Sequence, residues 1–242
     1  MTQRPGKTAK RVVVGGYRLL YPLVKRLGLA GRAKALYELT YWRARKSKEG
    51  TLANSWYEDV YTHHIGVERS FYQGKKILDI GCGPRGSLEW ADDAAERVGL
   101  DPLVNSYRAL GIDQHRMQYV NAPSEKIPFP DNYFDVVLSL NSLDHVDDVA
   151  QTAREIIRVT KPGGHFFVVV EVNHKPTIAE PQMLDWTLST YFQPQMRVLE
   201  EHHFEENPKG AGSTVSLRSK IPFDHQNSTP RSGVFLAKLI KV

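Results

Sequence analysis

The chain has 242 residues and one cysteine, and 41% of its residues are hydrophobic and 24% charged. This composition is ordinary for a globular protein and excludes collagen-like, disordered and multi-pass membrane classes. The length suits one α/β domain with a small appendage rather than two large domains. Because Cys82 has no second cysteine to pair with, it forms neither an intramolecular disulfide nor a thiolate zinc site, and we expect a reducing, cytoplasmic compartment.

The net charge of +5 is unevenly distributed. Residues 1–50 carry 13 Lys and Arg against 2 Glu, a net charge of +11, whereas the rest of the chain carries 19 basic and 25 acidic residues, a net charge of −6. This split predicts a basic arm that meets an anionic surface. The apolar run 12–16 is too short for a signal peptide, and no run is long enough to span a bilayer. We therefore expect a protein that does not cross a membrane, although it can touch the inner face of one.

The first 73 residues are expected to be mainly helical. In residues 1–50, apolar side chains at helical spacing predict a basic amphipathic arm that is broken at Pro22, Gly28 and Gly31. Residues 51–73 are rich in aromatic side chains and predict a helical cap.

From residue 74 to 242 the pattern changes to short apolar runs separated by helical stretches. Seven such runs predict a doubly wound, mostly parallel sheet with helices on both faces. The runs are residues 75–81, 97–102, 117–123, 135–140, 165–172, 197–204 and 233–242. The helix before the fifth run is expected to be capped by Asp147 or Asp148 and to end at the Lys-Pro-Gly-Gly sequence of residues 161–164.

A glycine-rich turn follows the first strand in the sequence ILDIGCGPRG, residues 77–86. The glycines match the dinucleotide-binding spacing, and Asp101 follows the second strand at a distance suited to a ribose diol. However, Pro84 removes a backbone N–H that a pyrophosphate would use, and Asp79 places a carboxylate beside the turn. A ligand that carries an ammonium and a sulfonium suits this turn better. The alternative is that the glycines only close a turn.

Four segments in this order resemble the class I S-adenosylmethionine-dependent methyltransferases, over residues 74–242. The segments are ILDIGCGPRG, RVGLDP, SEKIPFPDNYFDVVLSLNSLDHVDD and EIIRVTKPGGHFFVV. The resemblance implies a Rossmann-like sheet of seven strands, the last antiparallel, and S-adenosylmethionine as the methyl donor. It implies donor-binding roles for Asp79, Gly81, Cys82 and Gly83 at the methionine part, for Asp101 at the ribose hydroxyls, and for Pro102 and Leu103 at the adenine.

One residue departs from the pattern of this family. Pro123 stands where many members carry an aspartate that accepts from the adenine amine. Ala122, Ser124 and Glu125 remain as neighbours of the expected adenine, and Glu125 offers a carboxylate.

The loop after the fourth strand, residues 141–148, is expected at the edge to which the donor methyl points. We expect Asn141 to contact the donor, and His145, with Asp144 beside it, to be the catalytic base. The alternative for His145 is a packed histidine without a catalytic role. Acidic residues in this region also suggest a magnesium site, but Asp147 and Asp148 have helix-capping roles, so we expect no metal. That acidic set is Asp144, Asp147, Asp148 and Glu171.

Three later segments bear on the acceptor. Polar residues in 171–181 could line a pocket for a hydroxyl-rich acceptor or form a solvated loop. The run 200–206 resembles a metal cluster, but its side chains alternate between strand faces, which predicts a solvated edge strand. The long connection 207–232 is expected over the active site.

Three classes of function fit these patterns. The first is methylation, by preference O-methylation, of a small-molecule or glycan acceptor, such as a lipid-linked sugar. The second is RNA methylation with the basic arm on phosphates, and the third is donor binding without catalysis. For the arm, we predict docking on an anionic membrane, because basic residues recur every seven positions; the alternative is a cap over the donor pocket. These basic residues are Arg11, Arg18, Lys25 and Arg32.

Overall fold

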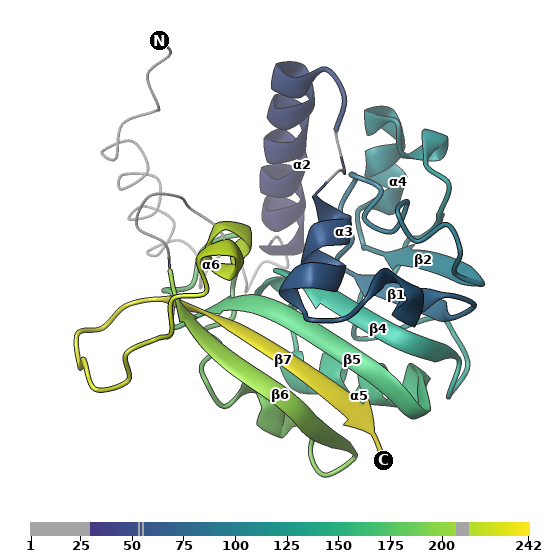
Figure 1. Cartoon of the computed structure of the whole chain (residues 1–242). Coiled ribbons are helices and arrows are strands. Elements are labelled where there is room, and N and C mark those ends of the chain that lie inside the picture. Colours follow the sequence, from purple (N-terminus) through teal and green to yellow (C-terminus); the bar gives the residue numbers. More distant parts are fainter. Residues whose placement is uncertain (1–29, 53, 55, 207–212) are drawn as a thin grey trace, which may run out of the picture.

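The computed structural model describes residues 30–52, 54, 56–206 and 213–242, and its centre is a seven-stranded sheet (Figure 1). The strand order is β3-β2-β1-β4-β5-β7-β6. The strands are β1 (Lys76–Ile80), β2 (Glu96–Leu100), β3 (Gln118–Val120), β4 (Phe134–Leu140), β5 (Thr160–Val172), β6 (Met196–Glu205) and β7 (Gly233–Lys241). All seven coincide with the apolar runs predicted from the sequence.

The direction of the strands also follows the prediction. β1 pairs in parallel with β2 and β4, and the parallel pairing continues to β3 on one side and β5 on the other. β7 is antiparallel to both of its neighbours, β5 and β6. β6 lies at the edge of the sheet, as expected for the run 200–206. The doubly wound, mostly parallel sheet with an antiparallel last strand is confirmed.

Both faces of the sheet are buried, because successive strand residues enter two different cores. In β5, Phe166 and Val168 belong to the core that contains α5 (Val149–Val159), whereas Phe167 and Val169 face the core of the segment 57–72. That segment holds α3 (Tyr57–Asp59), the π-helical turn η1 (Val60–His64) and the 3-10 turn η2 (Arg69–Tyr72). The remaining helices and turns are α4 (Val104–Tyr107), η3 (Arg108–Leu110), η4 (Ile112–Gln114), η5 (Leu143–His145), η6 (Leu188–Phe192) and α6 (Ser213–Ser219).

Local capping explains where α5 begins. The side chain of Asp148 accepts a hydrogen bond from the backbone N–H of Gln151 at 2.9 Å, so Asp148 rather than Asp147 is the N-cap. The helix ends at Val159, two residues before the Lys-Pro-Gly-Gly sequence, and Gly163 has a φ of +73° that a side chain would disfavour.

α2 (Ala30–Glu49) is the described part of the basic arm, and residues 1–29, with the predicted breaks at Pro22 and Gly28, lie outside the described residues. The break predicted at Gly31 is wrong, because Gly31 lies in the first turn of a continuous helix. α2 stands next to the sheet domain in Figure 1. A hydrogen bond from the ammonium of Lys34 to the carbonyl of His145 connects the two. Within the described ranges, no helix is both long and apolar enough to cross a membrane.

Candidate active site

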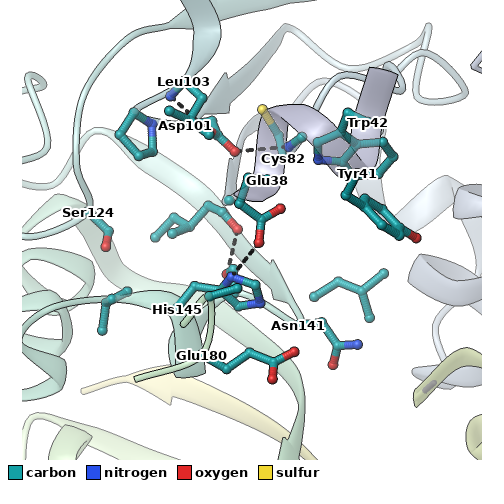
Figure 2. A pocket seen from close by; sticks show the side chains of 18 of the residues that line it. Glu38, Tyr41, Trp42, Cys82, Asp101, Leu103, Ser124, Asn141, His145 and Glu180 are labelled. Carbon is teal, nitrogen blue, oxygen red and sulfur yellow. Dashed lines mark hydrogen bonds and ion pairs between the residues drawn. The ribbon is translucent and has the colours of Figure 1, made fainter. Parts of the chain in front are cut away.

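A cavity of about 1020 Å³ lies where the carboxyl ends of β1, β2 and β4 meet α2 (Figure 2). In open α/β sheets, ligands bind at this edge, next to the point where the strand order reverses. Ten of the side chains and glycines predicted from the sequence line it: Gly81, Cys82, Gly83, Asp101, Pro102, Leu103, Ser124, Glu125, Asn141 and His145. Three lie behind the lining: Asp79, Ala122 and Asp144.

The glycine turn after β1 packs closely against the loop after β4. Gly81 has a φ of +68°, and a Cβ at that position would lie 2.2 Å from the Cβ of Ser142. The Ser142 hydroxyl also donates to the carbonyl of Ile80 at 2.8 Å. Gly83 has a φ of +58° and lies under the indole of Trp42 from α2. The absence of side chains at both glycines therefore lets the turn pack closely against Ser142 and Trp42.

Asp79 supports this turn from behind. Tyr61 donates its hydroxyl to one carboxylate oxygen at 2.8 Å, and the hydroxyl of Ser87 donates to the other. Burial raises the pKa of Asp79 to about 7, although these hydrogen bonds oppose the shift. The carboxylate is thus a buried acceptor that ties the cap to β1, and it does not itself line the cavity.

Asp101 connects the end of β2 to the glycine turn. One carboxylate oxygen accepts from the N–H of Leu103 at 2.8 Å and the other from the N–H of Gly83 at 3.2 Å. Burial raises the pKa of Asp101 to about 6, against these hydrogen bonds, which lower it. A carboxylate has about four acceptor positions, so each oxygen can accept a further hydroxyl donor from the cavity.

The adenine neighbours predicted from the sequence have their side chains engaged elsewhere. Glu125 accepts from the N–H groups of Asp147 and Asp148 at 2.7 and 3.2 Å and so holds the start of α5. Ser124 shares a hydrogen bond with Thr152 at 3.1 Å, and Ala122 packs against the core. Of this group, Ser124 and Glu125 reach the cavity together with Pro123.

His145 is held between α2 and the loop after β4. Its Nδ1 lies 3.3 Å from a carboxylate oxygen of Glu38, and its Nε2 lies 3.9 Å from Asp144. Burial lowers its pKa, but the hydrogen bond with Glu38 and the charge of Asp144 outweigh this effect, so the pKa of His145 is raised overall. Figure 2 shows His145 between Glu38 and Glu180, which also line the cavity.

The cavity continues past His145 into an acidic region. Glu171, Glu180 and Glu206 line it, together with Arg218 of α6. Burial raises the pKa of Glu171, and the charges of Glu206 and Asp144 raise it further. Thr214 and Arg218 therefore bring α6, the first described part of the 207–232 connection, to this cavity, whereas residues 207–212 are outside the described ranges.

Sequence reasoning did not identify the lining residues of α2. They are Gly31, Lys34, Ala35, Tyr37, Glu38, Tyr41, Trp42 and Arg45. The aromatic residues of α2 recur at helical spacing, which indicates that one face of the helix packs on the protein. This spacing does not show which surface the helix covers. α2 lines the cavity, so the described part of the arm adopts the alternative arrangement, a cap over the expected donor pocket.

The cavity fits the expected donor on three features of the structure. The glycine turn lines the cavity, and Asp101 has acceptor positions to spare. The side-chain oxygen of Asn141 is buried and has no hydrogen-bond partner among the described residues, so it can accept from an ammonium group. Asn141 has a φ of +49°, a conformation that is uncommon for a residue with a side chain.

Comparison with known proteins agrees with this geometry. Residues 78–168 match a family model described as a methyltransferase domain. The ubiquinone/menaquinone biosynthesis C-methyltransferase UbiE of Ectopseudomonas mendocina is 39% identical over 111 residues, which cover 40% of this chain and 41% of that protein. The chloroplastic tocopherol O-methyltransferase of Arabidopsis thaliana is 31% identical over 120 residues, 46% of this chain and 34% of that protein. The chain thus spans about a third to a half of the length of such relatives.

Solved structures share the fold. A methyltransferase in complex with the Trm112 methyltransferase activator of Haloferax volcanii superposes with a TM-score of 0.56 and 18% identity, covering 84% of this chain and 97% of that one. The [4+2]-cyclase SpnF gives a TM-score of 0.51 and 20% identity, over 72% of this chain and 78% of that one. Since one of these is named a cyclase, the fold alone does not define the reaction. The match over residues 78–168 shows that the chain carries a methyltransferase domain, and the cavity lies at the strand ends of that domain.

Proposed function

We propose that the chain transfers a methyl group from S-adenosylmethionine to a hydroxyl oxygen of a small polar molecule, with a sugar among the candidate acceptors. One observation carries this proposal: a single cavity has the glycine turn and Asp101 at one end and His145 and the acidic region at the other. S-adenosylmethionine supplies an electrophilic methyl group on its sulfonium when bound.

The side chains of this chain have separable tasks in such a reaction. Asp101 would accept from the ribose hydroxyls, and the turn at Gly81–Gly83 would hold the methionine part. His145 would accept the proton of the attacking hydroxyl, because its ring lies on the acceptor side of the cavity between Glu38 and Asp144. Methyl transfer is an in-line displacement, so most of the remaining work is to hold oxygen, methyl and sulfur in a line.

The acceptor end suits a molecule with several hydroxyl groups. Glu171, Glu180 and Glu206 offer acceptor oxygens, and hydroxyl groups are donors that such oxygens bind. The curated relatives named above are called tocopherol and ubiquinone/menaquinone methyltransferases, which supports testing small molecules before polymers as acceptors.

A transfer assay with a labelled methyl donor tests the proposal. Purified protein, donor and separate pools of sugars, phenols, amines and RNA should yield labelled product in a hydroxyl-bearing small-molecule pool. Label confined to RNA would favour the alternative in which the basic arm binds phosphates. Donor binding without label in any pool would favour a binding protein and contradict the proposal.

We also propose that the arm formed by residues 1–50 binds an anionic membrane surface. α2 contributes Arg32, Arg43, Arg45, Lys46 and Lys48, and Leu36 on the same helix is 63% exposed. Each basic residue near an anionic surface contributes about 1 kcal/mol, and an exposed apolar side chain adds insertion. Of the four basic residues that recur every seven positions, Arg11, Arg18 and Lys25 lie outside the described residues.

Co-sedimentation with vesicles measures this binding. The protein should pellet with anionic vesicles at low salt, should be released as salt is raised, and should stay in the supernatant with neutral vesicles. A Leu36→Ser variant should pellet less at equal salt. Equal recovery in the supernatant with both kinds of vesicle would contradict membrane docking.

A further inference from the structure

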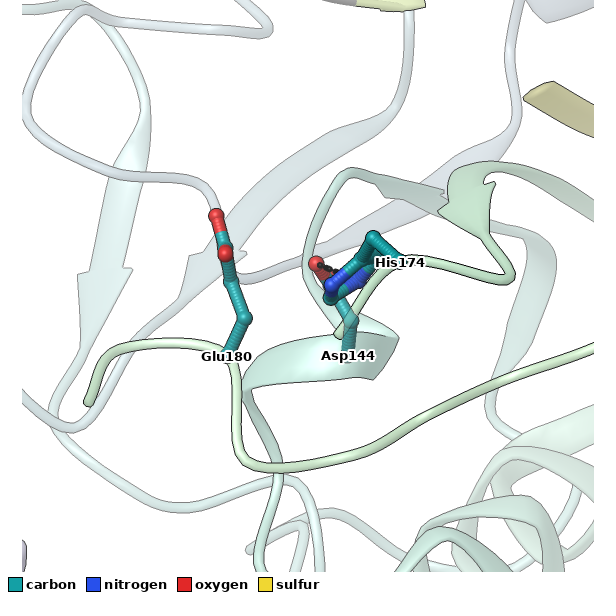
Figure 3. A group of neighbouring side chains, drawn as sticks. All are labelled: Asp144, His174 and Glu180. Atoms are coloured by element: carbon teal, nitrogen blue, oxygen red, sulfur yellow. Dashed lines mark ion pairs between the residues drawn. The ribbon is translucent and has the colours of Figure 1, made fainter. Parts of the chain in front are cut away.

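The residues Asp144, His174 and Glu180 meet beside the acceptor end of the cavity, from three places in the sequence (Figure 3). Asp144 belongs to the turn η5 after β4, His174 follows β5 by two residues, and Glu180 lies further along the same loop. One ligand atom from each of the three lies within 4.8 Å of the others. This set differs from the four acidic residues considered from the sequence, of which it retains Asp144 alone.

Asp144 is the buried member of the group. It is 3% exposed, and its Oδ1 has no hydrogen-bond partner among the described residues. Its Oδ2 lies 3.5 Å from Nε2 of His174, a nitrogen that also lacks a hydrogen-bond partner. Leaving such atoms unpaired is costly, so their convergence calls for a cation between them.

Neighbouring groups orient the other two side chains. Nδ1 of His174 lies 3.2 Å from the carbonyl of Lys175, so this nitrogen donates and Nε2 is turned toward Asp144. Histidine ligands of metals are commonly fixed in this way, through the second ring nitrogen. Glu180 receives a hydrogen bond from the hydroxyl of Thr177 at 2.9 Å on Oε2, and within the described part of the chain Oε1 remains available as a ligand atom.

We propose that Asp144, His174 and Glu180 bind one divalent transition-metal ion of the zinc type. Ligands at about 2.0 to 2.2 Å from a tetrahedral ion are roughly 3.4 Å apart, close to the separation of Asp144 and His174. An imidazole with two carboxylates favours zinc, manganese or iron over calcium, which prefers oxygen ligands alone. Glu180 needs only a small side-chain movement to complete the set.

Three protein ligands leave a fourth position open, as in zinc sites that bind a reacting molecule. Glu180 lines the cavity, so this position faces the acceptor region. The ion would then hold a hydroxyl oxygen of the acceptor and lower the pKa of that hydroxyl. This role rests on the proposed O-methylation, whereas metal binding itself does not.

Metal binding to the intact chain tests the site without donor or acceptor. Chelator-stripped protein should take up one equivalent of Zn²⁺ by isothermal titration and metal analysis, and excess Mg²⁺ or Ca²⁺ should not displace it. His174→Ala and Glu180→Gln should each weaken Zn²⁺ binding by at least about 100-fold. Substitution of residues that only hydrogen-bond to a metal ligand already weakens metal binding by about 10- to 100-fold. Co²⁺ should give a visible absorption band in the wild type that both variants lose.

The pair His203 and His225 supplies the matched control. Their ring nitrogens lie 2.9 Å apart on the outer edge of the sheet, away from the cavity lining, and could bind Zn²⁺ weakly. His225→Ala should leave the bound equivalent intact. Zn²⁺ uptake that His225→Ala abolishes and His174→Ala does not, or no uptake by the wild type, would show that Asp144 and His174 form only an ion pair and would overturn the proposal.

Discussion

Replacing Asp101 with alanine is expected to weaken S-adenosylmethionine binding by about 10- to 150-fold for each ribose hydrogen bond lost, because a hydrogen bond to a charged group contributes about 1.5 to 3 kcal/mol. Calorimetric titration of the donor measures the change directly. The carboxylate also holds the N–H groups of Leu103 and Gly83, so part of the loss comes through the turn. Asp101→Asn keeps the shape of the side chain and should lose less.

The pH dependence of donor binding separates the effect of the Asp101 charge from the effect of the shape of its side chain. Since burial raises the pKa of Asp101 to about 6, the acceptor carboxylate is present above that pH and becomes protonated as the pH falls through it. Donor affinity should therefore be constant above pH 7 and fall below pH 6 by up to about tenfold per pH unit. Glu38 raises this pKa and His145 lowers it. A step near pH 7 that persists in Asp101→Asn would belong to Asp79, and unchanged affinity in a folded Asp101→Ala variant would contradict the ribose assignment.

His145→Ala is expected to lower kcat by about 10²- to 10⁴-fold while the donor Kd changes little, because a general base acts in the transition state and not on the bound donor. Single-turnover transfer and donor titration on the same preparation provide both numbers. His63→Ala is the control, since His63 is exposed and lies outside the cavity lining. A loss of donor affinity as large as the loss of rate would instead make His145 part of the pocket wall.

The sheet could be predicted from the sequence because the apolar pattern that marks a buried strand lies within the residues of that strand. Residues 166–170, for example, are continuously apolar, as in strands covered on both faces, and the structure places strands at all seven runs. The ends of β1, β2 and β4 could be predicted as the site for the same reason, since the position of a loop follows from the strand before it. Gly81, Asp101 and Asn141 all line the cavity.

Contacts between distant segments could not be predicted in this way. Nothing near Glu38 in the sequence shows that a helix more than 100 residues before His145 supplies its hydrogen-bond partner. Glu125 looked available to a ligand, but the unpaired N–H groups at the start of α5 use its carboxylate. His174 and Asp144 meet because β4 and β5 are neighbours, and the loop that returns to 180 closes the group.

The position of β7 has a consequence for how the chain is made. β7 is the last strand in the sequence, yet it is buried between β5 and β6 and pairs with both. In the described sheet, β7 is the one strand that pairs with β6. During synthesis, residues 196–205 therefore have no strand partner until residues 233–241 have left the ribosome. An unpaired strand edge is a common starting point for aggregation. Until residues 233–241 are available, the edge of β6 is therefore exposed, and a chaperone that shields unpaired strands would be expected to bind there.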